Sequence, residues 1–198
     1  MGTKTASGPI RPWAAKSSRK SADYRVFNIR TDRKVSPLTG AEHDFHIIES
    51  VNWVNVIAVT PRRELVMVEQ YRHGSDTVEL EIPGGMMDPG ETDPVATAVR
   101  EFREETGYEG GPARVIGQVF PNPAIMNNIC YTVLISDCVP RHATVFDPTE
   151  DLITRLEPVA GISALISAGR IRHSLVIAAL YHFEIWRAGS DSERGRGG

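Results

Sequence analysis

The sequence predicts an α+β fold, in which short strands surround one well-defined helix and two further helices follow near the C-terminus. Two observations carry this prediction. Runs rich in β-branched and aromatic residues, separated by turn residues, recur between residues 24 and 82 and between residues 114 and 157. A helix with both a start and a stop signal lies between these two regions. Because the strands do not alternate one by one with helices, α+β layers are favoured over a regular βαβ array.

The strands are expected between two polar chain ends. Residues 1–21 and 189–198 are rich in small and charged residues, so both are predicted to be flexible tails. A short pair of strands within residues 22–50 and a main domain over residues 51–188 are predicted between them. The predicted strands are Tyr24–Arg30, His43–Glu49, Val51–Thr60, Glu64–Arg72, Val78–Ile82, Arg114–Phe120, Ile129–Asp137 and Leu152–Glu157.

Three helices are predicted from their end signals. Asp93 is suited to cap the first helix, Pro94 to begin it, and Gly107 to end it. A short second helix is expected over Ile162–Ser167. The third begins at Ser174 and runs towards residue 188, and it is apolar almost all round, which predicts burial in the core or at a subunit interface.

The composition excludes several classes of protein. With 41% hydrophobic and 24% charged residues among 198, the chain is neither wholly disordered nor collagen-like, and no apolar run approaches the roughly 20 residues needed to cross a bilayer. The net charge of -3 gives no general attraction to nucleic acid or to anionic lipid, so neither is expected as a partner. Residues 1–20 contain no hydrophobic stretch of the secretory type, and a cytoplasmic location is therefore expected.

The first predicted helix carries an unfavourable cluster of charges. Glu101, Glu104 and Glu105 fall on one arc of the helix, near its C-terminal end. Like charges at these spacings each cost a few tenths of a kcal/mol, and acidic groups in a last turn also face the negative end of the helix dipole. A solvated acidic face, relieved by Arg100 and Arg103, is one interpretation. A binding site that offsets the cost is the other.

The segment before this helix favours the second interpretation. Gly84, Gly85 and Gly90 allow a tight backbone turn and a close approach to a ligand, and Glu91 is placed to reach back to the helix as an anchor. Carboxylates that face a glycine-rich loop suit hard divalent cations, which prefer oxygen ligands and usually keep several waters. The pattern therefore predicts a site for a divalent cation.

These residues together resemble the signature of the Nudix hydrolase family: Gly, five residues, Glu, seven residues, then Arg-Glu-apolar-x-Glu-Glu-x-Gly-apolar. The matching positions are Gly85, Glu91, Arg100, Glu101, Phe102, Glu104, Glu105, Gly107 and Tyr108. The one departure is a spacing of eight residues between Glu91 and Arg100. An extra residue at Thr92–Asp93 lengthens the loop before the helix and leaves the carboxylates in the same relative positions.

The resemblance extends to one branch of the family, the ADP-ribose pyrophosphatases and nucleoside-diphosphate-sugar hydrolases. It rests on residues 69–72, 79–85, 122–124, 150–152 and 169–171. The resemblance implies a Nudix-type α/β/α sandwich with a small N-terminal β-strand extension. It also implies a homodimer, to which residues 22–50 contribute contacts. The implied reaction is hydrolysis of the diphosphate of ADP-ribose or a similar compound, which gives a nucleoside monophosphate and a sugar phosphate.

The same resemblance assigns the cation and catalytic groups. Glu101 and Glu105, with the carbonyl of Gly84, would bind Mg²⁺ or Mn²⁺. Glu104 would be a further ligand or catalytic carboxylate, and Arg100 would orient these acids. Glu150, in the acidic run 146–151, stands where this branch carries its loop glutamate and would act as the base or bind an additional cation. The alternative for Glu150 is a solvent-exposed side chain, with Asp147 and Asp151 capping turns.

Three residues are candidates for binding substrate. Arg72 resembles the diphosphate-binding arginine of the branch, although an ordinary surface arginine is the alternative. Glu79 and Glu81 have two-residue spacing, so they share a strand face, and one of them, preferably Glu81, is placed to hold ribose hydroxyls or metal-bound water. Trp53 is a candidate for stacking on a base, with a place in the core as its alternative.

Two other functions are compatible with the sequence. One is a non-catalytic Nudix-fold nucleotide sensor, against which the complete set of carboxylates argues. The other is a Nudix hydrolase that acts on nucleoside triphosphates or capped RNA, and an RNA substrate would favour a basic stripe that the charge balance does not show.

Overall fold

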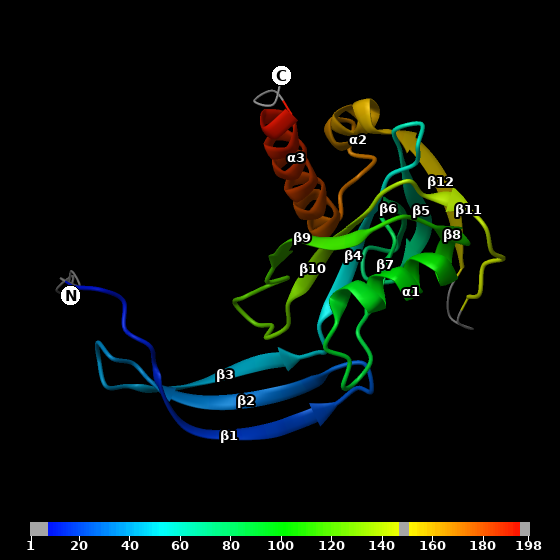
Figure 1. The fold of residues 1–198 in the computed structure, drawn as a ribbon. Coiled ribbons are helices and arrows are strands. Elements are labelled where there is room, and N and C mark those ends of the chain that lie inside the picture. The colour runs from blue at the N-terminus through cyan, green and yellow to red at the C-terminus, as the bar shows by residue number, and fades with distance from the viewer. Residues whose placement is uncertain (1–7, 147–150, 195–198) are drawn as a thin grey trace. The chain divides into compact units, whose positions relative to one another are not determined.

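The computed structural model in Figure 1 describes residues 8–146 and 151–194, which form two compact units. Unit 1 comprises the chain up to Ser50 together with Asn122–Asn128. Unit 2 comprises Val51–Pro121 and the chain from Ile129 onward. Unit 2 therefore contains every carboxylate of the predicted cation site.

Unit 1 is built on a three-stranded antiparallel sheet in the order β1-β2-β3, drawn in blue in Figure 1. Its strands are β1 (Ala14–Asp23), β2 (Asn28–Val35) and β3 (Glu42–Glu49). The prediction that residues 1–21 form a flexible tail is wrong from Ala14 onward. β1 carries no apolar alternation that could reveal it, and its pairing with β2 is supported by polar contacts, such as that of the Ser18 hydroxyl with Asp32 at 2.7 Å.

The predicted strand Tyr24–Arg30 is also displaced. β2 begins four residues later, because Tyr24–Phe27 forms the turn that reverses the chain between β1 and β2. In this turn the N–H of Tyr24 donates to the carbonyl of Phe27, and Arg25 has a positive φ of 63°. The aromatic residues that suggested a strand therefore belong to a connection.

Unit 2 contains nine strands in three sheets among its described residues. A mixed sheet has the order β7-β4-β10-β9, in which β4 and β10 are parallel, and the antiparallel sheets have the orders β12-β5-β6 and β11-β8. The strands are β4 (Trp53–Ala58), β5 (Glu64–Arg72), β6 (Thr77–Glu81), β7 (Gly84–Met86), β8 (Tyr108–Glu109), β9 (Ala113–Val119), β10 (Cys130–Ile135), β11 (Val139–Pro140) and β12 (Leu152–Pro158).

The three predicted helices are present in unit 2. They are α1 (Pro94–Thr106), α2 (Ile162–Ser167) and α3 (Ser174–Arg194), with a 3₁₀ turn (Val159–Gly161) directly before α2. α3 continues to Arg194, so the predicted tail 189–198 is wrong for its first six residues. Gly189 does not end the helix, and the Ser190 hydroxyl donates to the Trp186 carbonyl within it. No helix of the described part of the chain is long and apolar enough to span a membrane.

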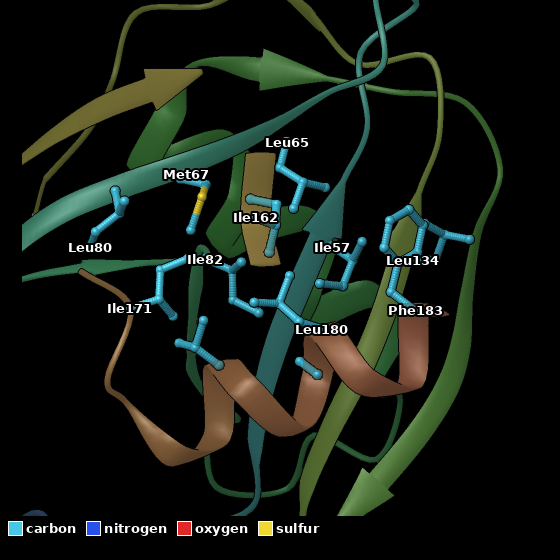
Figure 2. Packing of buried hydrophobic residues seen from close by; sticks show 12 residues of the cluster. Ile57, Leu65, Met67, Leu80, Ile82, Leu134, Ile162, Ile171, Leu180 and Phe183 are labelled. Carbon is cyan, nitrogen blue, oxygen red and sulfur yellow. The ribbon is translucent and has the colours of Figure 1, made fainter. Parts of the chain in front are cut away.

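Two buried apolar clusters lie on opposite faces of β4. Ile57 joins the first cluster, shown in Figure 2, with residues of β5, β6, β10, α2 and α3. Val56 and Ala58 join the second cluster with Ala98 and Phe102 of α1. Because side chains alternate along a strand, α1 covers one face of β4 and α3 covers the other. The predicted α/β/α sandwich is confirmed.

α3 is only partly buried, although its sequence is apolar almost all round. Val176, Leu180 and Phe183 point into the first cluster. Ile177, Tyr181 and Ile185 lie on another stripe of the helix and are exposed. The helix therefore has a core face and an uncovered apolar face.

Both ends of α1 are fixed by local contacts. Asp93 accepts a hydrogen bond from the N–H of Val95 at 2.9 Å, and Gly107 ends the helix in the left-handed conformation with φ 71°. The Gly107 carbonyl accepts hydrogen bonds from the N–H groups of Arg141 and His142, both at 2.9 Å. The predicted boundaries of this helix are confirmed, and its C-terminal end is tied to the segment after β11.

Candidate functional site

Two carboxylates of α1 lie against the backbone of β7. The Gly84 N–H donates to the Glu105 carboxylate at 3.1 Å, and Glu105 is buried. A Cβ atom on Gly85 would lie 2.5–2.7 Å from the carboxylate atoms of Glu101. Glu101 and Glu105 are one helical turn apart, so one face of α1 directs both at this glycine pair. The sequence does not predict β7, because glycines carry no strand pattern. Its pairing with β4 brings the two glycines to α1.

Arg100 is the cation that organises the acidic groups. Its Nη1 donates to Glu101 at 3.0 Å and to Glu104 at 3.2 Å, and its Nη2 lies 3.6 Å from a Glu91 oxygen. Glu104 is the more exposed of the two acids that share Nη1. These contacts agree with the orienting role predicted for Arg100, and they bring Glu104 into the same cluster.

Glu91 anchors the loop before α1. Its carboxylate accepts hydrogen bonds from the N–H of Asp88 and from the Thr97 hydroxyl, both at 2.8 Å. The hydrogen bond from the Asp88 backbone, followed by that from Thr97, holds the pKa of Glu91 below its ordinary value. Glu91 therefore reaches the helix despite the extra residue in the spacing.

Arg72 of β5 and Glu81 of β6 form an ion pair. The Nε and Nη2 atoms of Arg72 donate to the two oxygens of Glu81 at 2.9 and 2.8 Å. Glu81 is buried and Arg72 is exposed. The carboxylate of Glu81 thus holds the arginine, an arrangement that does not support the prediction that Glu81 binds ribose hydroxyls itself.

A second ion pair on β6 was missed by the sequence analysis. Arg172, between α2 and α3, donates to Glu79 through Nη2 at 2.6 Å and through Nε at 3.3 Å. Hydrogen bonding by Thr77 and then by Arg172 lowers the pKa of Glu79, although burial acts in the opposite direction. The two-residue spacing of Glu79 and Glu81, which places both on one strand face, was the signal in the sequence. Nothing in the sequence indicated which arginine would reach Glu79.

One predicted residue, Trp53, is not brought to this cluster. Trp53 shares its face of β4 with Asn55, whose side-chain amide donates to the Leu175 carbonyl of α3, so Trp53 lies across the sheet from α1. This placement does not support base stacking beside the carboxylates. Glu150 and Asp147 lie outside the described residues, and Asp151 is exposed.

The residues fit a hard divalent cation that keeps much of its water. Within residues 8–146 and 151–194, no group of three or more His, Cys, Asp or Glu gathers closely enough to form a complete metal cage. Mg²⁺ does not need such a cage, since it is usually held by one or two carboxylates together with waters and substrate phosphates. The close approach of Glu101 and Glu105 to the backbone of Gly84 and Gly85 provides these ligands.

Fold and site together define a class of α/β/α proteins in which one helix presents carboxylates to a glycine-rich strand. Residues 50–164, more than half of the chain, match the NUDIX domain. The chain belongs to the Nudix family. The resemblance seen in the sequence is confirmed at the level of the family.

Several known proteins are similar to part of this chain. The chain is 42% identical over 85 residues to the methanol dehydrogenase activator of Bacillus methanolicus, covering 43% of this chain and 45% of that protein. It is 33% identical over 91 residues to the ADP-ribose pyrophosphatase of Bacillus subtilis, covering 46% and 49%. The matched segments thus span about half the length of these two relatives.

Other matches are longer but less similar. The ADP-ribose pyrophosphatase of Mycobacterium tuberculosis is 26% identical over 157 residues, covering 78% of this chain and 75% of that protein. A crystal structure of an ADP compounds hydrolase superposes with a TM-score of 0.80 at 20% identity, covering 93% of this chain and 98% of that one. At this identity the structural match shows the shared fold.

Proposed function

We propose that this protein hydrolyses the diphosphate bond of nucleoside-diphosphate-linked compounds such as ADP-ribose or nucleoside-diphosphate sugars. The products would be a nucleoside monophosphate and a sugar phosphate. The observation that carries the proposal is the placement of Glu101 and Glu105 against the glycine pair of β7, with Arg100 beside them. The names of the relatives from Bacillus subtilis and Mycobacterium tuberculosis support the same substrate class.

The roles of the residues follow from their contacts. Glu101, Glu105 and the Gly84 carbonyl would hold Mg²⁺ or Mn²⁺, which when bound would neutralise negative charge on the diphosphate. Arg100 keeps Glu101 and Glu104 oriented through its shared Nη1. Arg72, fixed by buried Glu81, would bind the diphosphate with the outer edge of its guanidinium.

The proposed base is Glu150. An attacking water needs a carboxylate within hydrogen-bond reach, and the branch resemblance points to this position. Glu150→Gln should lower kcat by about a hundredfold or more, with KM nearly unchanged. A loss of only two- or threefold would transfer the role to Asp151, Asp147 or Glu104.

A substrate panel tests the proposed function. ADP-ribose, ADP-glucose, GDP-mannose, nucleoside triphosphates and capped RNA would be incubated with the protein and Mg²⁺, and a coupled phosphatase would release phosphate from the monoester products. We expect turnover of the diphosphate-linked sugars, its loss in EDTA, and its return with Mg²⁺ or Mn²⁺. Preference for triphosphates or capped RNA, full activity in EDTA, or binding without turnover would contradict the proposal.

We also propose a homodimer. The exposed stripe Ile177, Tyr181 and Ile185 on α3 is an apolar surface of the kind that protein contacts cover. Unit 1 contributes no residue to either buried apolar cluster of the described chain, so its sheet gains stability from packing against a partner. Sedimentation that shows only monomer at micromolar concentration would contradict this.

A cytoplasmic location stays a prediction, and it is compatible with the two free, buried cysteines.

A further inference from the structure

β6 holds two buried carboxylates on one face. Glu79 and Glu81 lie on either side of Leu80, which points the other way into the apolar cluster of Figure 2. Their side chains are 7% and 3% exposed. Successive residues on one face of a strand are about 7 Å apart, so the two carboxylates lie close to each other. Two buried carboxylates this close repel each other unless cations neutralise them.

Each carboxylate holds one arginine in the same manner. Arg72 and Arg172 both use Nε and Nη2 on their carboxylates, and Nη2 of Arg172 also lies 3.2 Å from the Thr77 hydroxyl. The arginine side chains are 44% and 53% exposed, although their partners are buried. The structure therefore holds two oriented guanidinium groups, each about half exposed to solvent, on buried carboxylates.

Arg172 is fixed by its neighbour as well as by its carboxylate. Ile171 is buried in the first apolar cluster, so the backbone that carries Arg172 is held at the edge of β6. Hydrogen bonds from the Ser75 and Thr77 hydroxyls complete the surroundings of Glu79, at 3.3 and 2.5 Å. The guanidinium is thus oriented before any ligand arrives, which lowers the entropy cost of binding one.

Fold stability alone does not require this arrangement. A buried ion pair contributes little compared with apolar residues of the same volume, because removing the charges from water offsets their attraction. An arginine that stays about half exposed while a buried carboxylate orients it suits recognition of phosphoryl oxygens, to which guanidinium groups donate charged hydrogen bonds. The position on the same strand face as the Arg72 pair points to the same ligand.

We infer that Arg172 is a substrate-binding residue, and that Arg72 and Arg172 together bind the two phosphoryl groups of the substrate's diphosphate. The inference rests on the proposed function and extends its binding site from the end of β5 to the segment between α2 and α3. Glu79 is then a positioning residue, which acts on substrate through Arg172.

The test compares binding of ADP with binding of adenosine, measured by calorimetry in buffer that contains Mg²⁺. Arg172→Gln should raise the Kd for ADP about tenfold or more, the loss expected for a hydrogen bond to a charged group. The Kd for adenosine, which lacks phosphate, should not change. Arg155→Gln is the matched control, since it removes a half-exposed arginine paired with Glu69 on the neighbouring strand β5.

A double variant separates substrate binding from a purely structural role. In Glu79→Gln/Arg172→Gln no buried charge is left unpaired, so the melting temperature should recover relative to Arg172→Gln. We expect the Kd for ADP and the KM for ADP-ribose to remain raised in this variant, with kcat nearly unchanged. Recovery of both constants in the double variant, or normal values in Arg172→Gln, would overturn the inference. Absence of turnover by the unmodified protein would contradict the proposed function instead, and ADP binding would still report on Arg172.

Discussion

The two units of this protein are each stabilised by a different kind of interaction. In unit 2, the buried residues of β4 are apolar, and Val54, Val56 and Ile57 pack on both faces of the strand. In unit 1, the buried residues of β2 are Thr31 and Asp32, which are polar. Asp32 contacts Ser18 and Arg30, and Thr31 contacts Ser21. Burial of apolar surface therefore stabilises unit 2, while strand pairing and polar contacts stabilise unit 1.

This difference shows where a rigid site can be built. Glu101 and Glu105 stand on a helix whose Phe102 is buried in the second apolar cluster, so packing fixes their positions. The polar contacts of unit 1 are weaker and depend on salt and pH. Perturbations of the two units should therefore differ in size and in kind.

The largest effect is expected for Glu105→Gln in unit 2. This change keeps the size of the side chain and removes one negative charge from the proposed cation site, so kcat should fall about a thousandfold or more. Steady-state kinetics with ADP-ribose and Mg²⁺ measure it. Glu184→Gln, on the surface of α3, makes the same chemical change away from the site and should leave kcat unaltered. Equal losses in both variants would contradict the assignment.

The next effect compares one substitution in both units. Phe102→Ala removes a side chain that is 1% exposed, and it should lower the free energy of unfolding by about 3–5 kcal/mol. Phe45 of β3 is 38% exposed and packs edge-on against Trp13, so Phe45→Ala should cost about 1 kcal/mol. Urea denaturation followed by circular dichroism gives both values. Similar values would show that unit 1 also relies on apolar burial.

A smaller effect is expected in unit 1 at low pH. Hydrogen bonding by Ser18, followed by that of Arg30 and against the effect of burial, lowers the pKa of Asp32 below its ordinary value of 3.8. Ionised Asp32 therefore stabilises the sheet above pH 3.8, and this contribution is lost as the pH falls through the lower pKa of the folded state. Hydrogen exchange should show that the amides of β1–β3 lose protection on acidification before those of β4 and β10.

Asp32→Asn provides the check on this pH dependence. It should weaken the protection of β1 and β2 at neutral pH by about 1 kcal/mol and flatten its dependence on acid. Asp137→Asn in unit 2 is the control, because Asp137 is exposed and has a positive φ that asparagine also tolerates. Unchanged acid sensitivity in Asp32→Asn would assign the effect to another group.

The smallest effect is expected for the two cysteines, which should not react with thiol reagents in the folded protein. Both cysteines of the chain lie in unit 2, and burial raises the pKa of Cys130 and of Cys138 to about 12. Thiol reagents at pH 8 should therefore label the native protein only when unit 2 opens. The labelling rate should fall with increasing stability of unit 2, and Asp32→Asn should leave it unchanged. Rapid labelling of the native protein would show that unit 2 is less compact than its packing indicates.

The sequence predicted the elements whose formation depends on local signals. α1 has both the predicted ends because Asp93, Pro94 and Gly107 act within one helical turn of them. β5 lies where its apolar run predicts it. β1 and β7 were missed, since a polar strand and a glycine strand carry no periodic apolar pattern. β1 forms through pairing with the next strand, β2, and β7 through pairing with β4, which is distant in the sequence.

The same distinction applies to the candidate site. Glu101, Glu104, Glu105 and Arg100 share one helix, so their spacing was enough to group them. Arg172 reaches Glu79 across 93 positions of the chain, and no local pattern encodes that contact. The face occupied by Trp53 likewise depends on which helix covers each side of β4, which only the packing of the whole unit decides.

The two adjacent glycines of β7 should respond differently in a library of substitutions. A side chain at Gly84 would collide with the Val54 carbonyl of the neighbouring strand, so variants at this position should be depleted for poor folding. A side chain at Gly85 would meet the carboxylate of Glu101, which is the far end of a flexible side chain and can shift more cheaply than backbone. Variants at Gly85 should therefore remain abundant and soluble while losing activity. Neighbouring positions of one strand would thus separate selection for folding from selection for catalysis.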